Sequence, residues 1–176
     1  MTEPTRLFDC LQYHLERTPL PVMLSAKESG QWKGYSTREV KTTVDRLSAG
    51  LLKLGITAGD MSVTGRDKIA ILCKNRPEWV MLDLAIQQIG ALLVPIYPTI
   101  NVNELEFVLK DAQVKMIFVN DEELFHKVLS IKERTPSVQE IFTIEHAANA
   151  RHWKEVSNMA DDASMAQVKP ASDRIG

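Results

Sequence analysis

Two sequence patterns alternate along this chain between residues 68 and 144, and few folds can accommodate such an alternation. Short, mostly apolar segments typical of buried strands are separated by longer segments in which apolar residues recur at helical spacing. Strands and helices that alternate with short connections are typical of a parallel sheet covered by helices and wound right-handedly. We therefore predict an α/β fold with a layered, mostly parallel sheet flanked by helices. The predicted strands are residues 68–73, 92–96, 115–119 and 140–144, and the predicted helices are 77–90, 101–112 and 122–134.

A small helix and a hairpin are predicted ahead of this sheet. Leu7, Leu11 and Leu15 recur at helical spacing until two prolines end the pattern. Two apolar or aromatic segments, 21–26 and 31–35, flank a Ser-Gly turn signal at residues 29 and 30 and predict the hairpin.

A second helix and the domain boundary follow from local signals. Ser36 and Glu39 have the spacing of a capping box, and Gly55 stands where a helix C-cap belongs. We predict one α/β domain over residues 1–145. Residues 146–176 are poorly patterned and are expected to form a partly flexible tail, since the stretch from 161 onward is polar, small and aperiodic.

Composition excludes several classes of protein. The chain has 176 residues, 44% hydrophobic and 25% charged, which is the balance of a globular domain with a real core. A net charge of -2, with acidic and basic residues interspersed, argues against a nucleic-acid partner.

Cys10 and Cys73 lie far apart and are predicted to be reduced core thiols. No export signal is recognised at the first residues, so we expect a cytoplasmic location, with peripheral membrane contact left open.

The common catalytic motifs are missing from the sequence. There is no GxxxxGK[ST] loop, no GxGxxG at a strand-to-helix turn and no GxSxG elbow. The four histidines show neither HxxxH nor HExxH spacing, so no metal site is predicted. We predict no catalytic residue in this chain.

Several segments are more specific than a generic α/β layer. They are Tyr-Ser-Thr at 35–37, Asn-Arg-Pro-Glu-Trp at 75–79, Gly-Ala-Leu-Leu-Val-Pro-Ile-Tyr-Pro-Thr at 90–99, Asn-Glu-Leu at 103–105 and Lys-Met-Ile-Phe-Val at 115–119. In this order and at these separations the set resembles the N-terminal subdomain of the adenylate-forming superfamily over roughly residues 5–145. The second and third segments look most like the long-chain fatty-acid–CoA ligase branch.

The resemblance implies a reaction for the complete protein. A fatty carboxylate would attack ATP, with Mg²⁺ balancing the phosphate charge, and CoA would then displace AMP from the acyl-adenylate. The family's phosphate loop, adenine segment, ribose ligand, hinge and lysine are not found here, so we expect a truncated part of that fold. The chain alone is therefore expected to be inactive, with no bound cofactor and only feeble nucleotide binding.

The resemblance also suggests where a substrate would pass. Tyr97, Pro98 and Thr99 correspond to a turn near the CoA passage of relatives, at the carboxyl end of a predicted strand, where open α/β sheets place ligand crevices. A rigid turn made by the prolines is the alternative explanation. Trp79 is interpreted as a core residue. Arg76 could bind an anion, but an arginine at a helix entrance more often pairs with a nearby carboxylate such as Glu78 or remains solvated, and we interpret it as solvated.

Other functions remain open at this point. The Leu7, Leu11 and Leu15 stripe could serve a self-associating scaffold or a homodimer, or it could pack on the chain's own sheet. Another adenylate-forming enzyme, such as an aryl-CoA ligase or a peptide-synthetase adenylation domain, has the same fold. A receiver-like regulatory module would need acidic residues clustered at strand ends, and the sequence does not supply them. Acyl chain length lies outside what these residues determine.

Overall fold

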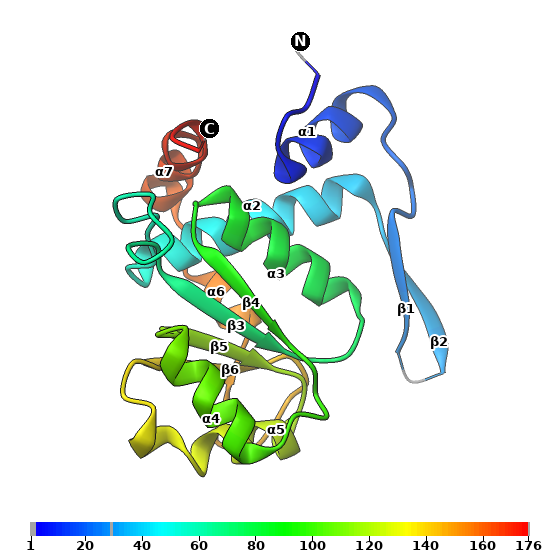
Figure 1. The fold of residues 1–176 in the computed structure, drawn as a ribbon. Coiled ribbons are helices and arrows are strands. Elements are labelled where there is room, and N and C mark those ends of the chain that lie inside the picture. The colour runs from blue at the N-terminus through cyan, green and yellow to red at the C-terminus, as the bar shows by residue number, and fades with distance from the viewer. Residues whose placement is uncertain (1–2, 29, 176) are drawn as a thin grey trace.

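The computed structural model describes residues 3–28 and 30–175, and its elements follow the predicted order (Figure 1). Ser29 of the predicted turn lies outside the described residues. The helices are α1 (Leu7–Arg17), α2 (Thr37–Lys53), α3 (Pro77–Gln88), α4 (Val102–Asp111), α5 (Glu122–Leu129), α6 (Lys154–Asn158) and α7 (Asp162–Asp173), with a 3-10 turn η1 (Lys132–Arg134). The strands are β1 (Leu24–Glu28), β2 (Gln31–Tyr35), β3 (Lys68–Leu72), β4 (Leu92–Ile96), β5 (Met116–Val119), β6 (Glu140–Thr143) and β7 (Arg151–His152).

The main sheet is parallel, and its spatial order is β4-β3-β5-β6-β7. Its central strands are buried on both faces, which explains why the sequence shows continuous apolar runs there instead of alternation. The predicted α/β fold with a helix-flanked parallel sheet is confirmed. The hairpin β1–β2 forms a separate antiparallel ribbon.

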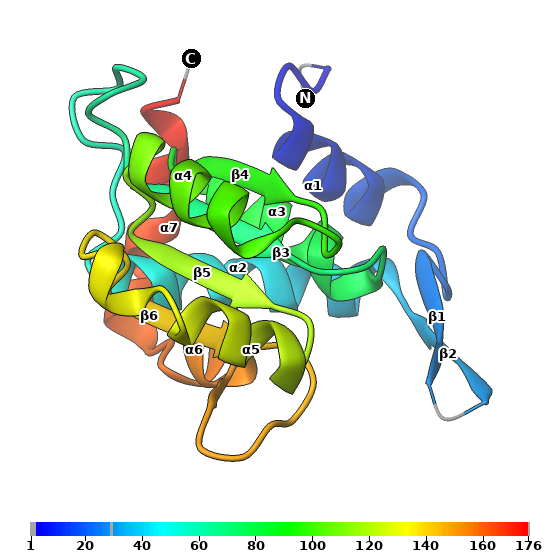
Figure 2. The ribbon, with the colours of Figure 1, turned by 60° about the horizontal axis from the view of Figure 1, so that its bottom comes forward.

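Two apolar cores lie on opposite faces of this sheet. On one face, Ile69, Ile71 and Phe118 pack with residues of α1, α2 and α3. On the other face, Ala70 and Ile117 pack with residues of α4 and α5. Figure 2 shows α4 and α5 on the side of the sheet away from α2. The period-2 alternation within each strand thus separates the two cores.

The connections leave the sheet in opposite directions. β3 leads through α3 to its neighbour β4, whereas β5 leads through α5 to its neighbour β6 on the other side. Because α3 and α5 cover opposite faces, the chain leaves the adjacent strands β3 and β5 toward opposite faces at their carboxyl ends. This is a topological switch point, where open α/β sheets hold ligands.

Local signals account for several helix ends. The hydroxyl of Ser36 accepts from the N–H of Glu39, and the Glu39 carboxylate accepts from the N–H of Ser36, so the predicted capping box is present. Pro77 occupies the first turn of α3, where its missing N–H has no intrahelical partner to lose. Gly55 has φ of 77°, which suits the predicted C-cap after α2.

The predicted lack of pattern in the last segment is wrong. Residues 151–173 form β7, α6 and α7, and α6 and α7 both pack against α2. The sequence did not indicate α7 because it buries only Val168 and contains Pro170. Residues far from α7 in the sequence hold it in place. The Arg6 guanidinium donates hydrogen bonds to the carbonyl oxygens of Ser172 and Ile175, both at 2.6 Å. The flexibility of this segment and the boundary at residue 145 stay predictions.

The leucine stripe of α1 is divided between the core and the surface. Leu11 is buried in the core beside α2 and α3, with 2% of its surface exposed, whereas Leu7 is 56% exposed. Of the three leucines, Leu11 therefore packs on the chain's own helices and Leu7 does not. Within residues 3–28 and 30–175, no helix is long and apolar enough to cross a membrane.

Candidate functional site

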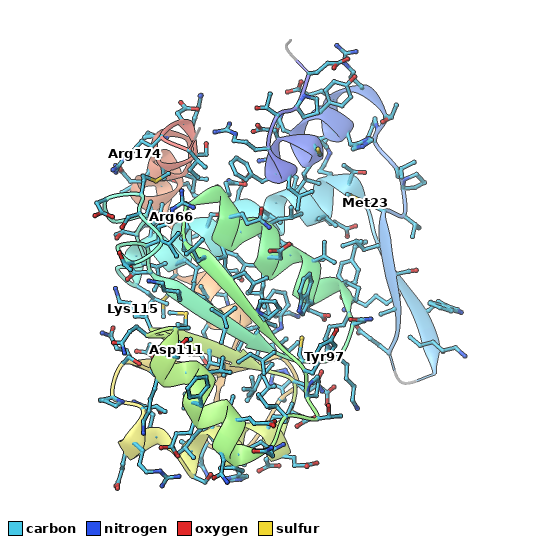
Figure 3. The ribbon with its side chains drawn as sticks, viewed as in Figure 1. Met23, Arg66, Tyr97, Asp111, Lys115 and Arg174 are labelled. Atoms are coloured by element: carbon cyan, nitrogen blue, oxygen red, sulfur yellow. The ribbon has the colours of Figure 1, made fainter. Side chains whose placement is uncertain are left out.

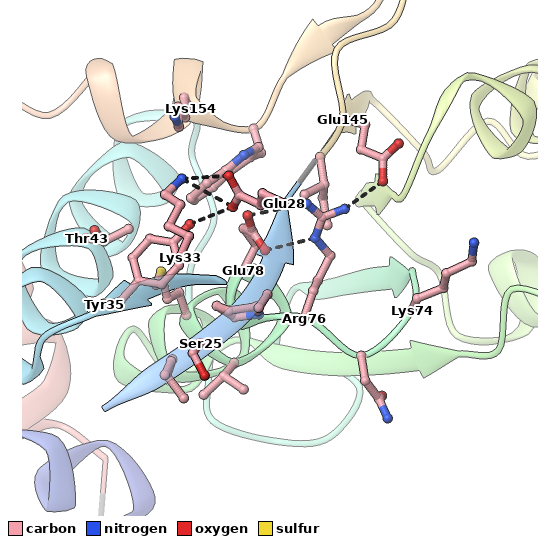
Figure 4. A pocket seen from close by; sticks show the side chains of 18 of the residues that line it. Ser25, Glu28, Lys33, Tyr35, Thr43, Lys74, Arg76, Glu78, Glu145 and Lys154 are labelled. Atoms are coloured by element: carbon pink, nitrogen blue, oxygen red, sulfur yellow. Dashed lines mark hydrogen bonds and ion pairs between the residues drawn. The ribbon is translucent and has the colours of Figure 1, made fainter. Parts of the chain in front are cut away.

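A cleft of about 1410 Å³ lies between the hairpin β1–β2 and the carboxyl ends of the sheet strands. One wall comes from the hairpin, and the other comes from the segments that follow β3, β5 and β6 (Figure 4). Its floor therefore includes the switch point between β3 and β5. Its lining includes polar, charged and aromatic side chains, among them Lys27, Glu28, Trp32, Lys33, Tyr35, Lys74, Arg76, Glu78, Asn120, Glu145, His146, His152 and Lys154.

Arg76 joins the strand ends at the floor of the cleft. Its Nε lies 2.8 Å from Oε2 of Glu78, and its Nη1 lies 3.1 Å from Oε1 of Glu145 and 3.3 Å from Oδ1 of Asn120. Asn120 also donates through Nδ2 to the same Glu145 oxygen at 3.1 Å. One guanidinium thus links the turn after β3, the end of β5 and the end of β6.

The interpretation of Arg76 as a solvated side chain is wrong. The side chain is 19% exposed, and the Glu78 side chain that it contacts is 8% exposed. Burial alone would lower the pKa of the Arg76 guanidinium, but the hydrogen bond to Glu78 and the charges of Glu78 and Glu145 outweigh it and raise the pKa. The pair is a fixed part of the cleft because a half-buried carboxylate and guanidinium satisfy each other.

The hairpin wall has its own charged cluster. Lys33 Nζ lies 3.1 Å from Oε2 of Glu28, and the Tyr35 hydroxyl donates to Oε1 of Glu28 at 3.1 Å. These bonds, with Lys33 as the main cause, hold the pKa of the Glu28 carboxyl below its usual value. Burial is the main reason why the pKa of the Tyr35 phenol is raised. Glu28 is therefore ionised and Tyr35 is neutral near pH 7.

Two histidine rings stack at the far end of the cleft. The rings of His146 and His152 have centroids 4.0 Å apart and planes inclined by 8°. Nε2 of His152 lies 2.9 Å from the carbonyl oxygen of Ile144, so that nitrogen is a donor. Burial, and then the neighbouring His146, lower the pKa of His152. His152 is therefore neutral at pH 7.

Charged side chains of both signs line the cleft. Glu28 and Glu78 are matched by Lys33 and Arg76, whereas the ammonium groups of Lys74 and Lys154 make no hydrogen bond or ion pair with another described residue. Burial raises the pKa of the nearby Cys73 thiol to about 12, which leaves almost no thiolate at neutral pH.

The residues present do not fit a metal ion. Across the described ranges, no group of three or more His, Cys, Asp or Glu side chains could hold one.

The three residues predicted at the CoA entrance lie outside this cleft. Tyr97 follows β4, the edge strand of the sheet, and is 85% exposed (Figure 3). Pro98 is half-buried, Thr99 is exposed, and the N–H of Ile100 bonds the carbonyl of Tyr97 to close a turn. The structure therefore keeps the three together on the surface beside the sheet, and their role stays a prediction. Trp79 packs against the core, as predicted.

Sequence reasoning missed the residues that build the cleft. Arg76, Asn120 and Glu145 each follow a strand closely, and the carboxyl ends of parallel strands meet at one edge. That positional signal was available for the sheet. The contribution of the hairpin to the cleft, through residues such as Glu28 and Lys33, was not predictable. Nothing in the sequence says where a hairpin lies relative to a sheet.

Comparison with known proteins gives a consistent result. A family model described as AMP-binding enzyme matches residues 11–175. The chain is 29% identical over 115 residues to the long-chain-fatty-acid–CoA ligase FadD15 of Mycobacterium bovis, which is 65% of this chain and 18% of that protein. It is 23% identical over 147 residues to long chain acyl-CoA synthetase 3 of Arabidopsis thaliana, which is 81% of this chain and 21% of that protein. The chain therefore matches only about a fifth of the length of these curated relatives.

Solved structures share the fold. The anthranilate CoA ligase AuaEII, solved with anthranoyl-AMP, matches with a TM-score of 0.69 at 18% identity, over 86% of this chain and 26% of that one. A crystal structure described as a putative long-chain-fatty-acid CoA ligase from Rhodopseudomonas palustris matches with a TM-score of 0.69 at 24% identity, over 89% of this chain and 36% of that one. The family model covers nearly the whole chain, and the parallel sheet agrees with these structures. On this evidence, the chain belongs to the family of AMP-binding enzymes.

Proposed function

We propose that this chain is the N-terminal part of a long-chain fatty-acid–CoA ligase. In the proposed reaction a fatty carboxylate and ATP give acyl-adenylate and pyrophosphate, and CoA then gives acyl-CoA and AMP. The observation that supports the fatty-acid branch is the similarity to FadD15 over 115 residues. The chain's own part in this scheme is to build the sheet and the cleft between the hairpin and the switch point.

The charged side chains in the cleft lining support a division of labour. An acyl chain would need an apolar pocket, whereas Lys33, Arg76 and Glu78 place charges across this one. We infer that the acyl chain is held outside the cleft. ATP and Mg²⁺ are proposed as substrate and cofactor of the complete enzyme, held by residues beyond those described here.

The first test is the reading frame beyond codon 176. Our proposal expects a glycine- and threonine-rich phosphate loop within about thirty codons, because residues 169–176 resemble the stretch that precedes this loop in the family. A continuation without such a loop, or a stop codon, would contradict the proposal.

The second test is an assay of the polypeptide encoded by the complete reading frame. Incubation with palmitate, ATP·Mg²⁺ and CoA should give palmitoyl-CoA and AMP in equal amounts, measured by mass spectrometry. Benzoate and anthranilate are the matched alternative acids, since an aryl-CoA ligase has the same fold. Preferential turnover of an aryl acid would contradict the proposed fatty-acid substrate and would assign the enzyme to the aryl-CoA ligases.

A further inference from the structure

Helix α7 has few contacts of its own to hold it in place. It buries only Val168, and Pro170 inside the helix has no N–H to donate to the preceding turn. The carbonyl groups in the last turn of any helix also lack intrahelical donors. The position of the end of α7 therefore depends on contacts from other parts of the chain.

Arg6 supplies such contacts at the end of α7. Its Nη1 donates to the carbonyl oxygens of Ser172 and Ile175, both at 2.6 Å. One nitrogen thus joins the last turn of the helix to the residues just beyond it. In both ribbon views the start of α1 and the end of α7 lie at the same side of the molecule (Figures 1 and 2). A cation at this end also complements the partial negative charge of the helix dipole.

The Arg6 guanidinium is itself fixed on its other side. Its Nε lies 2.7 Å from Oδ2 of Asp9, and its Nη2 lies 2.9 Å from Oδ1, which is the two-pronged pairing of arginine with a carboxylate. Cζ of Arg6 lies 4.6 Å from the centroid of the Phe8 ring, and Phe8 is buried in the main core. Arg6 therefore ties the end of α7 to the start of α1 and, through Phe8, to the core.

The residue beyond α7 is also held from a second side. Ile175 packs against the main core beside Gly90, which follows α3. A Cβ added at Gly90 would lie 3.4 Å from Cγ1 of Ile175 and only 2.7 Å from Cβ of Ala58. Gly90 thus leaves room for this packing. The point at which the chain leaves the domain is set by Arg6 on one side and by the end of α3 on the other.

We propose that Arg6 is a positioning residue for ATP binding in the complete enzyme, because it fixes the place where the ATP-binding segment beyond residue 176 begins. The inference rests on the proposed function, which assigns ATP to that segment. In this role Arg6 does not touch the nucleotide and acts through the end of α7. A displacement of about 1 Å far from the chemistry can cost on the order of 100-fold in rate, so a released α7 should weaken the handling of ATP.

Steady-state kinetics of the complete enzyme with palmitate, ATP·Mg²⁺ and CoA test this proposal. Arg6→Ala should raise the KM for ATP about tenfold, while the KM for CoA stays within about twofold of the wild-type value. Arg6→Lys keeps the charge but loses the fork, so it should recover only part of this loss. Lys169→Ala is the matched control on α7, because the ion pair of Lys169 with Asp173 is solvent-exposed, and it should keep the wild-type KM for ATP.

A purely structural role for Arg6 gives a different result. If Arg6 only keeps the protein folded, Arg6→Ala lowers the active fraction and hence kcat, and the KM for ATP does not change. That result overturns the proposal, as does an equal rise of this KM in Arg6→Ala and Lys169→Ala. Asp9→Asn is the second variant if Arg6→Ala is insoluble, because it weakens the pairing that fixes Arg6. An unchanged KM for ATP in both Asp9→Asn and Arg6→Lys overturns the proposal too.

Calorimetry with ATP·Mg²⁺ on the same complete proteins separates this inference from the proposed function. A wild-type protein that binds ATP·Mg²⁺ but makes no acyl-CoA overturns the function, and about tenfold weaker binding by Arg6→Ala then still supports the positioning role. An active ligase in which Arg6→Ala binds ATP·Mg²⁺ as tightly as the wild type overturns the positioning role and leaves the function in place. A wild-type protein that binds no ATP·Mg²⁺ overturns both.

Discussion

Arg76 connects three segments that are far apart in sequence, so its removal has a defined effect. In Arg76→Met, the buried Glu78 carboxylate loses its partner, and Asn120 and Glu145 lose a donor. We expect a loss of about 2–3 kcal/mol in the free energy of unfolding, because an unpaired half-buried charge is costly.

Urea denaturation of the purified chain measures this loss, and Lys74→Met is the matched control. Lys74 is exposed on the same turn and makes no hydrogen bond with a described residue. Arg76→Lys should restore little, since lysine lacks the planar fork that reaches Glu78 and Glu145 together. Equal stability of the Arg76→Met and Lys74→Met variants would show that the network contributes nothing.

Cys73 should behave as an unreactive thiol. Burial raises its pKa from 9.0 to about 12, so the thiolate is scarce at pH 8, and iodoacetamide should modify it at least about 100-fold more slowly than a free cysteine. The raised pKa favours the folded state fully below pH 9, and this contribution is lost as the pH rises toward 12. Mass spectrometry of alkylated peptides checks the rate, and Cys73→Ala should weaken the alkaline decline in stability.

At the scale of elements, the helix starts were the most predictable features. The capping box of Ser36 and Glu39 was predicted from two residues because its hydrogen bonds are local. Ser36→Ala should therefore cost about 1 kcal/mol of stability, measured by thermal or urea unfolding. Ser36→Asn keeps an acceptor at the cap and should cost much less, so equal losses in both variants would place the effect elsewhere.

Helix α7 shows why its end of the chain was harder to predict. Its own residues bury little, and its position depends on Arg6 at one end and on Lys53, 2.5 Å from Asp161, at the other. Contacts between residues more than a hundred positions apart leave no local pattern. Periodicity therefore predicted the sheet region and did not predict this helix.

Arg6→Ala should loosen α7 without unfolding the sheet. Amides of residues 162–173 should exchange at least about tenfold faster, while those of β5 keep their protection. Lys169→Ala is the control on the same helix, because its ion pair with Asp173 is solvent-exposed. If both variants exchange alike, Arg6 does not hold the helix.

At the scale of the whole molecule, the order of the strands was the part that no single segment specified. The sequence predicted parallel strands and their helices, but the switch point between β3 and β5 appears only when the strands are placed side by side. The cleft adds a hairpin from the other end of the domain. Tyr97, chosen from a strand end, lies at the sheet edge instead, because β4 is the outermost strand.

Our account assigns the sheet and the cleft beside it to this chain, and the handling of ATP to residues beyond it. Isothermal titration calorimetry with ATP·Mg²⁺ tests this directly, by comparing the complete enzyme with the 176-residue chain. The complete enzyme should bind stoichiometrically, and the 176-residue chain should give no saturable heat in the micromolar range. Micromolar, one-to-one binding of ATP·Mg²⁺ by the 176-residue chain would contradict this division.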